Sequence, residues 1–373
     1  MSKYLVVVES PAKAKTIKKY LGHDYEVLAS YGHVRDLVPK DGAVDVTNAF
    51  AMKYQAIERN EKHVRAIQSA LRNADGLILA TDPDREGEAI SWHLLELLTE
   101  RNAMKNKTVE RVVFHEITER AVREAVAHPR QVATDLVNAQ QARRALDYLV
   151  GFNLSPLLWR KVAPGLSAGR VQSPALRLIC EREEEIKAFI PREYWTLLAA
   201  ADKGGSAFTA KLIELDGQKV EQFTVTEGPA ATAARDRLLK SAAGQLTVGT
   251  VDKKQRRRNP SPPFTTSTLQ QEANRKLGFT STRTMRTAQQ LYEGMDLGGE
   301  RTDSLSLSQD ALAEIRQTIV TEYGASACPP EARVFKTKSK NAQEAHEAVR
   351  PTSSLRTPKS VARFLGPDQL KLY

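Results

Sequence analysis

Short apolar runs alternate with amphipathic segments over residues 1–130 of the chain. Residues 4–8 (YLVVV) and 77–80 (LILA) are uninterrupted apolar runs, which is the pattern of strands buried on both faces. Each run leads into a segment whose apolar residues recur with helical spacing. Residues 111–114 (RVVF) predict another short strand, and residues 117–127 predict another helix. This alternation predicts an α/β sheet domain.

The pattern changes after residue 130 and predicts helical and β-rich domains. Residues 131–190 have long helical periodicity and predict a helical domain, whereas alternation over 191–252 predicts a β-rich segment. Residues 253–350 predict a further helical domain, and residues 351–373 begin another segment. The 253–350 domain opens with KKQRRR and the proline-rich NPSPPF, which we interpret as a solvated hinge rather than a base-contacting patch.

The same patterns predict the individual elements of this part. Alternation predicts strands at 195–200, 208–215 and 245–251. Helical spacing predicts helices at 137–150, 171–189, 268–277, 282–292 and 308–323, and the start of another at 342–349.

Acidic side chains cluster where two predicted strands end. Glu9 directly follows the first strand, and Asp82, Asp84 and Glu86 follow the second. Open α/β sheets bind ligands at the carboxyl ends of their strands, and two parallel neighbours would bring Glu9 beside Asp82 and Asp84. Hard oxygen donors suit Mg²⁺ better than Zn²⁺. The sequence therefore predicts a magnesium site made of Glu9, Asp82, Asp84 and Glu86.

The acidic run also has a purely structural interpretation. Asp84 has the position of a helix N-cap, and Glu86 and Glu88 in the first turn would complement the helix dipole. After the first strand, Ser10 and Pro11 are typical of a helix start. Lys13 then lies one turn into that helix and could reach a phosphate.

Composition narrows the class of protein. Lys and Arg number 55 against 45 Asp and Glu, so the chain of 373 residues carries a net charge of +10, which favours a polyanionic partner. Cys180 and Cys328 have no metal-ligand spacing, so neither a disulfide framework nor a zinc site follows. The chain begins directly with a predicted strand and has no apolar run of transmembrane length, so we expect a cytoplasmic protein without a membrane partner.

Two of these segments resemble the halves of a known domain. VVVESPAKAKTIKKYL and ILATDPDREGEAISWHL are similar to the two halves of the Toprim domain of the type IA topoisomerases, the family of bacterial DNA topoisomerase I. Four later segments resemble the same family in order: NAQQARRALDYLVGFNLSPLLWRKVAPGLSAGRVQSPALRLICERE, PSPPFTTSTLQQEA, RTDSLSLSQDAL and AQEAHEAVRPT. The resemblance implies a Rossmann-like Toprim domain followed by an incomplete type IA torus, because the family's returning segments would follow residues 351–373.

The resemblance also implies a chemistry. A type IA topoisomerase relaxes negatively supercoiled DNA with Mg²⁺ and without ATP, by cleaving one strand through a phosphotyrosine and passing the other strand. By resemblance, Glu9, Lys13, Arg301 and His346 lie at the scissile phosphate, where Glu9 protonates the leaving 3′ oxygen. Without its flanking match, His346 would be a helix-start histidine with no special role. Single-stranded or negatively supercoiled DNA, a monomer and a nucleoid-associated location are implied as well.

A groove for single-stranded DNA is expected in the 131–190 domain. Basic and aromatic side chains together suit phosphates and bases, and the small SAGRVQS loop could hold phosphates through its backbone N–H groups. The residues expected at DNA in this domain are Arg143, Arg144, Tyr148, Trp159, Arg160, Ser167, Ala168, Gly169, Arg170, Val171 and Gln172. His33, in SYGHVRDL, is expected near DNA as well, because it resembles a DNA-proximal position of the family. The alternative is that Tyr148 and Trp159 are core aromatics and that the arginines are solvated.

The family's nucleophilic tyrosine is absent at its expected place. In the family a short strand reading roughly GLITYM precedes RTDS, whereas here Gly298-Gly299-Glu300 leads directly into Arg301. Tyr292 or Tyr323 could replace it only by moving many ångströms, and errors of about 1 Å already cost a hundredfold in rate. We therefore expect no strand cleavage by this chain.

Two other functions share part of these features. A Toprim nuclease or primase would have the same carboxylates, but the SAGRVQS, TSTLQQEA and HEAVRP segments argue against that class. A non-catalytic fragment that binds single-stranded DNA would need the basic groove and no tyrosine.

Overall fold

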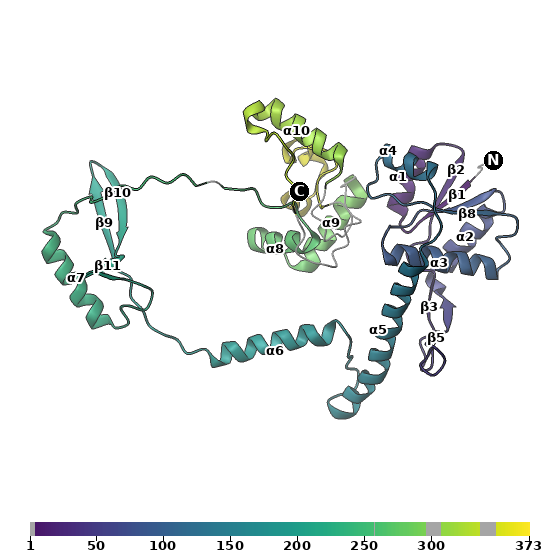
Figure 1. Cartoon of the computed structure of the whole chain (residues 1–373), viewed down its shortest axis with the longest axis horizontal. Helices are drawn as coiled ribbons and strands as arrows, with labels where there is room; N and C mark the ends of the chain where they lie inside the picture. Colours follow the sequence, from purple (N-terminus) through teal and green to yellow (C-terminus); the bar gives the residue numbers. More distant parts are fainter. Residues whose placement is uncertain (1–3, 257, 296–306, 336–347) are drawn as a thin grey trace. The chain divides into compact units, whose positions relative to one another are not determined.

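A parallel sheet forms the amino-terminal part of the protein, whose computed structural model describes residues 4–256, 258–295, 307–335 and 348–373. The sheet has four strands in the order β2-β1-β7-β8. They are β2 (Tyr25–Ala29), β1 (Tyr4–Val8), β7 (Gly76–Leu79) and β8 (Thr108–Arg111), and every neighbouring pair is parallel. The predicted α/β sheet domain is confirmed (Figure 1).

Helices cover both faces of this sheet. On one face α1 (Pro11–Leu21) and α4 (Glu119–Ala127) lie side by side, and on the other face lie α2 (Glu61–Leu71) and α3 (Arg85–Glu100) (Figure 1). Alternate residues of each strand point to opposite faces, so each strand contributes to two cores. Val6, Val8 and Ile78 pack with α1 and α4, and Leu5, Val7 and Leu79 pack with α2 and α3. This double burial is why the strands are continuous apolar runs in the sequence.

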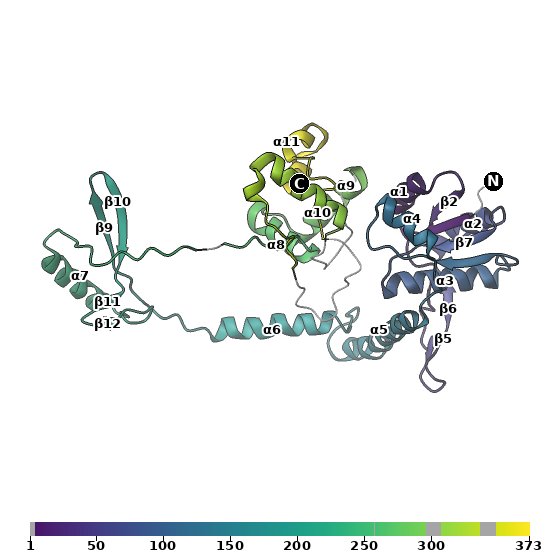
Figure 2. The same cartoon turned by 45° about the horizontal axis from the view of Figure 1, so that its top comes forward.

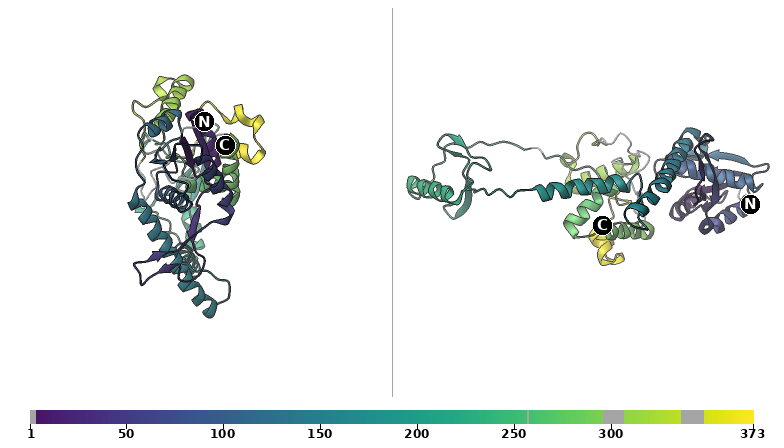
Figure 3. Two further views of the ribbon diagram at one scale, coloured as in Figure 1. Left: turned by 90° about the vertical axis from the view of Figure 1, so that its right-hand side faces the viewer. Right: turned by 90° about the horizontal axis from the view of Figure 1, so that it is seen from below.

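Two small hairpins extend the sheet domain between β2 and α2. They are formed by β3 (Arg35–Leu37) with β6 (Tyr54–Ala56) and by β4 (Val44–Asp45) with β5 (Ala51–Met52), and a 3₁₀ turn at Glu58–Asn60 leads into α2. Their apolar residues pack on the long helix α5 (Thr134–Lys161), which continues through Pro156 as one helix (Figure 3). The predicted helix at 137–150 is therefore the middle of a longer one.

The first compact unit is Met1–Gly169 with Pro260–Tyr373, and its remaining regular elements among the described residues are helices, apart from a bridge between Phe264 and Val349. These helices are α8 (Thr266–Leu277), α9 (Ser281–Met295), α10 (Gln309–Tyr323), α11 (Pro358–Val361) and α12 (Pro367–Leu372), with 3₁₀ turns at Ala325–Ala327 and Ala362–Phe364. Thr265 and Thr268 form a capping box at the start of α8, and Ser308 caps α10. An ion pair from Arg283 to Asp368, 2.7 Å long, joins α9 to α12. The predicted helices at 268–277, 282–292 and 308–323 are confirmed.

The second compact unit is Arg170–Asn259. It contains α6 (Gln172–Ala188), an antiparallel pair of β9 (Leu198–Lys203) and β10 (Ser206–Lys211), a short pair of β11 (Glu214–Leu215) and β12 (Gln218–Lys219), and α7 (Gly228–Ala242) (Figure 2). Gly204 and Gly205, both with positive φ, make the turn between β9 and β10.

Some predicted elements differ from those in the structure. The strand predicted at 111–114 lies earlier, at Thr108–Arg111, because its partner strand β7 ends at Leu79, opposite Arg111. The strand predicted at 245–251 is wrong, since this stretch has no regular structure, and α7 was missed because its many alanines carry little apolar periodicity. The helix predicted at 342–349 falls largely outside the described residues. None of the described helices is both long and apolar enough to cross a membrane.

Candidate functional site

The carboxyl edge of the sheet brings together side chains from β1 and β7. The two strands are parallel neighbours, with Val7 opposite Leu79, so the residues that follow them lie at the same edge. Glu9 follows β1 directly, and Asp82 follows β7 after two more residues. This register is the reason to expect Glu9 beside Asp82 and Asp84. The structure places Glu9 and Asp82 at one lysine, Lys13, whereas Asp84 caps the next helix.

Lys13 lies between these two carboxylates. Ser10 begins α1 by accepting a hydrogen bond from Lys13 N over 3.3 Å, and Pro11 takes the first turn, which places Lys13 over the strand ends. Its Nζ makes ion pairs with Glu9 Oε1 and with Asp82 Oδ1. The Lys13 side chain is 2% exposed, against 14% for Glu9 and 18% for Asp82, so this group of charges is largely buried.

Burial changes the chemistry of Glu9. Its pKa is raised above the ordinary value by desolvation and then by the charge of Asp82, while Lys13 opposes the shift. Although Lys13 is in ion-pair contact, neither buried Glu9 carboxylate oxygen accepts a hydrogen bond of regular geometry in the described part of the chain. Two hard carboxylates with spare oxygen lone pairs fit Mg²⁺, which commonly takes one or two protein carboxylates and keeps several waters.

Asp84 and Glu86 have other partners in this structure. Asp84 caps α3 by accepting a hydrogen bond from Gly87 N over 2.7 Å, as the structural interpretation predicts. Gly87 is required there because a Cβ atom would lie 2.1 Å from the Asp82 carbonyl oxygen. Glu86 accepts from His33 Nε2 at 3.3 Å and from Gln140 at 3.2 Å.

The ionised form of Glu86 is stabilised by these contacts. The hydrogen bond from His33 is the largest cause that lowers the pKa of Glu86, and Gln140 adds to it against the cost of burial. Across the residues that the structure describes, no group of three or more His, Cys, Asp or Glu side chains is arranged to hold a metal ion. The four predicted ligands therefore divide into the pair Glu9 and Asp82, the cap Asp84, and Glu86 with His33.

A buried arginine holds the backbone that carries Asp82, and the sequence analysis missed it. Arg111, at the end of β8, is 1% exposed and donates hydrogen bonds to the carbonyl oxygens of Thr81 at 2.7 Å and Asp82 at 2.6 Å. Its charge is balanced by the fully buried Glu88, 2.9 Å away. Glu88 also accepts from Arg130 and, over 3.0 Å, from the backbone N of Ala133 just before α5.

This network fixes the turn between β7 and α3. Burial lowers the pKa of Arg111, and the charge of Glu88 raises it again, so the two groups depend on each other. The one sequence signal for Arg111 as a buried support of this turn is its charge at the start of an otherwise apolar run, RVVF. Glu88 was interpreted as a helix-dipole residue, whereas it is the centre of the network.

The residues expected at DNA on α5 have different environments. Arg144 makes a bidentate ion pair with Asp36, through Nε to Oδ1 at 2.7 Å and through Nη2 to Oδ2 at 2.8 Å. Arg143 is half-buried. Tyr148 is 6% exposed, stacks on Phe152 and donates its hydroxyl hydrogen to the Lys40 carbonyl. The interpretation of Tyr148 as a core aromatic therefore describes its position, and the expected stacking face is covered.

The end of α5 and the SAGRVQS loop are more open. Trp159 is 48% exposed and donates from Nε1 to the Leu166 carbonyl at 2.5 Å, and Arg160 is exposed. In the loop, Ala168 is buried and its N donates to Ser155 Oγ over 3.1 Å, whereas Ser167, Val171 and Gln172 are exposed and Gly169 and Arg170 are half-buried. Arg301 and His346 fall outside the described residues, as does the segment from which the tyrosine is absent.

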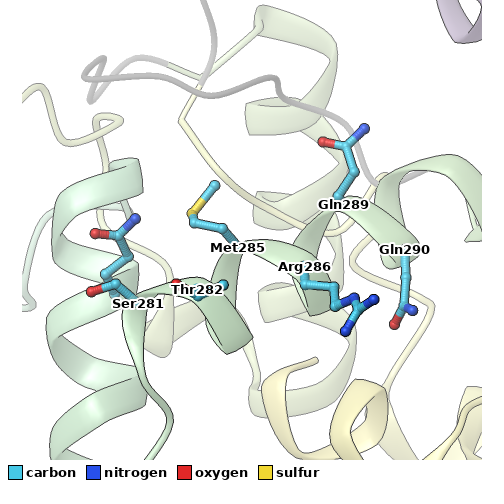
Figure 4. A pocket seen from close by; sticks show the side chains of 7 residues that line it. Ser281, Thr282, Met285, Arg286, Gln289 and Gln290 are labelled. Atoms are coloured by element: carbon cyan, nitrogen blue, oxygen red, sulfur yellow. The ribbon is translucent and has the colours of Figure 1, made fainter. Parts of the chain in front are cut away.

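A separate cavity of about 610 Å³ lies on α9 beside α8. Figure 4 shows that its lining follows successive turns of α9, and the lining residues are Gln270, Ser281, Thr282, Met285, Arg286, Gln289 and Gln290. Amides, hydroxyls and a guanidinium are groups that hydrogen-bond to phosphates and base edges. Most of the lining surface is nevertheless apolar, and none of the lining residues carries a carboxylate.

Comparison with known proteins gives consistent matches along the whole chain. A family described as DNA topoisomerase matches residues 131–373, and the Toprim domain matches residues 4–117. DNA topoisomerase 1 from two strains of Xylella fastidiosa is 62% and 63% identical over 100% of this chain and 47% of each relative. DNA topoisomerase 1 of Rickettsia felis is 52% identical over 99% of this chain and 48% of the relative.

A solved structure gives the same result. The full-length topoisomerase I from Thermotoga maritima is 39% identical, with a TM-score of 0.71 over 99% of this chain and 58% of that chain. The chain spans about half the length of the curated relatives that it matches.

Proposed function

Because the chain belongs to the type IA DNA topoisomerase family and has an amino-terminal Toprim domain, we propose that it binds Mg²⁺ and a DNA strand at the carboxyl edge of its sheet. The observation that carries this proposal is the buried group of Glu9, Lys13 and Asp82. At a strand edge, two carboxylates can bind a cation, and the ammonium group between them can bind a phosphate.

Glu9 and Asp82 are the proposed ligands of the metal. When bound, Mg²⁺ would neutralise charge on the DNA backbone and on the two carboxylates. Lys13 would then turn its charge toward a phosphate oxygen. Glu9 has two proposed roles, in two protonation states. Ionised, it is a metal ligand together with Asp82. Protonated, which the rise in its pKa on burial favours, it is the proposed acid for a leaving 3′ oxygen.

The proposed nucleic-acid partner is single-stranded or negatively supercoiled DNA, bound by a monomer near the nucleoid. The net charge of +10 supports a polyanionic partner. In the first unit His33, Arg160 and Trp159 supply charged and stacking groups, and in the second unit Arg170 supplies a further charge. Tyr148 is left out of this groove because its ring is covered. Arg301 and His346 keep their proposed roles at the scissile phosphate.

A test of strand binding is the salt dependence of single-stranded DNA affinity. For Arg170→Ala we expect weaker binding to all sequences and a salt slope lower by about 1, because one phosphate contact is lost. Arg177→Ala is the matched control, since Arg177 is exposed on α6 and paired with Glu181. A preference for duplex over single-stranded DNA, or equal slopes for both variants, would contradict the groove.

A second candidate function, strand binding without cleavage, is favoured by the missing nucleophile. No tyrosine occupies residues 296–300, directly before Arg301, so no hydroxyl is available at the position that the family uses. The test is to incubate the chain with end-labelled single-stranded DNA and Mg²⁺, denature it and look for protein-bound label. We expect none, and an adduct mapped to Tyr292 or Tyr323 would overturn this candidate.

A further inference from the structure

The loop that follows β2 contains a tyrosine in a strained backbone conformation. Tyr31 has a φ of 59°, in the left-handed region where bulky residues are rare, and Gly32 follows with a φ of 90°. Strain of this kind persists only where the surrounding structure over-determines the backbone, and it gathers at functional sites. The question is therefore what holds Tyr31 there and what its ring can reach.

Hydrogen bonds on every side fix this loop to the carboxyl edge of the sheet. The backbone N of Ser30 donates to Val8 O at 2.8 Å, and that of Gly32 donates to Glu9 O at 3.0 Å. The side-chain amide of the buried Asn60 donates to the carbonyl oxygens of Tyr31 at 3.2 Å and His33 at 2.7 Å. The loop is thus attached to the candidate metal ligand on one side and to α2 on the other.

The Tyr31 ring is both supported and accessible. It stacks on the ring of His63, with centroids 3.7 Å apart and planes 20° apart, and yet it is 48% exposed. Desolvation and then the charge of Lys62 lower the pKa of His63, so the supporting ring is neutral at pH 7. A rigid stacked pair that remains half-exposed is the geometry on which a further planar ring can stack.

The position of the Tyr31 and His63 rings near Glu9 and Glu86 indicates which ligand could stack on them. The backbone N of the next residue, Gly32, donates a hydrogen bond to the backbone carbonyl of Glu9. His33 follows, and its Nε2 lies 3.3 Å from the Glu86 carboxylate. We propose that Tyr31, supported by His63, is a stacking platform for one nucleobase of the strand whose phosphate lies at Lys13. This inference rests on the proposed function, and it adds a base contact that tolerates all sequences because every base has a π-face.

A purely structural role would give a different pattern of substitutions. A ring kept only for packing would be buried, and glycine at this position would relieve the strain without changing the ligand contacts. Tyr31→Gly should therefore keep or raise the midpoint of unfolding while it weakens binding. Phe50→Gly is the matched control, because Phe50 also has a positive φ, of 57°, and is 55% exposed, but lies in the turn between β4 and β5.

The experiment is a titration of the whole chain with single-stranded DNA that contains 2-aminopurine, followed by fluorescence quenching. We expect affinity to fall about tenfold in Tyr31→Gly and Tyr31→Leu, with loss of quenching, and to stay unchanged in Tyr31→Phe and Phe50→Gly. Normal affinity and quenching in Tyr31→Gly would overturn the platform and leave the proposed function intact. A loss in Tyr31→Phe as large as in Tyr31→Gly would assign the contact to the hydroxyl and overturn stacking, and a chain that binds no DNA at all would overturn both proposals.

Discussion

The parallel sheet and the unit Arg170–Asn259 use apolar side chains in opposite ways. In the sheet, the residues of β7 are all buried, and both faces are covered by helices. In the second unit, α6 has no buried residue, and Leu176, Leu178 and Ile179 are each more than 60% exposed. Among the described residues of that unit, the buried apolar side chains are Val225 and Ala231.

The difference shows where a site can be positioned accurately. Glu9 and Asp82 follow strands whose residues are packed on both faces. The backbone carbonyl of Asp82 also accepts a hydrogen bond from the buried Arg111. A catalytic constellation needs such a rigid supporting layer. The described residues of the exposed unit have charged and apolar surface without such a doubly covered sheet, which supports placing the proposed chemistry at the sheet. Three changes test this difference.

The largest effect is expected from the buried ion pair. Arg111→Ala leaves the charge of Glu88 buried without its partner and should cost about 3–5 kcal/mol in the free energy of unfolding. In the exposed unit, Arg177→Ala removes an ion pair whose arginine side chain is 79% exposed, and no measurable change is expected. Urea unfolding of both variants measures this, and equal midpoints would contradict the contrast.

A smaller loss is expected from a truncated core side chain. Leu79→Ala on β7 should destabilise the chain by about 2–5 kcal/mol, because it leaves a cavity between the sheet and α3. Leu178→Ala on α6 removes the same atoms from a side chain that is 67% exposed and should change stability by less than about 0.5 kcal/mol. Thermal unfolding scans compare the two, and a comparable loss in Leu178→Ala would show that α6 has a core of its own.

The smallest effect depends on pH. Burial, then the charges of Arg35 and His33, lowers the pKa of His93 to about 3, so the folded chain holds this ring neutral. In the unfolded state this histidine takes up a proton below about pH 6.5. Its contribution to the free energy of unfolding is therefore fully present above that pH and is lost as the pH falls toward 3. At pH 5 the loss is on the order of 2 kcal/mol.

His93→Gln should flatten the stability curve between pH 7 and 5. The second unit contains none of the seven histidines, so its unfolding should not show this slope. Denaturant titrations at several pH values measure both, and an unchanged slope in the His93 variant would contradict the assignment.

The sheet domain was predictable because its sequence signals are strong and local. Doubly buried strands gave continuous apolar runs, and Ser10 with Pro11 and Asp84 marked the helix starts at the residues where the structure has them. The helix predicted at 308–323 also begins where the structure has it, with Ser308 as its N-cap. In the second unit, QLTVGTV alternates like a strand but has no partner strand among the described residues, and the alanine-rich α7 gave no period.

The closeness of Glu9 and Asp82 was predictable from the sequence, but the partners of the individual carboxylates were not. The strand ends identified Glu9 and Asp82, whereas the division of labour among the four carboxylates depends on side-chain directions that spacing does not fix. Tyr148 was expected at DNA because sequence cannot show which face of α5 the hairpins cover. Arg111 and Glu88 were missed because their contact joins residues distant in the chain, and Arg301 and His346 stay predictions.

The most direct test of the proposed metal site is a calorimetric titration of Mg²⁺ into the intact chain and two aspartate variants. Asp75→Asn changes an exposed carboxylate at the opposite, amino edge of β7 and serves as the control. The account predicts that Asp82→Asn weakens Mg²⁺ binding about tenfold or more, because one of two protein carboxylates is lost, while Asp75→Asn binds as the unchanged chain does. Equal Mg²⁺ affinity in Asp82→Asn and in the unchanged chain would contradict the site at the carboxyl edge of the sheet.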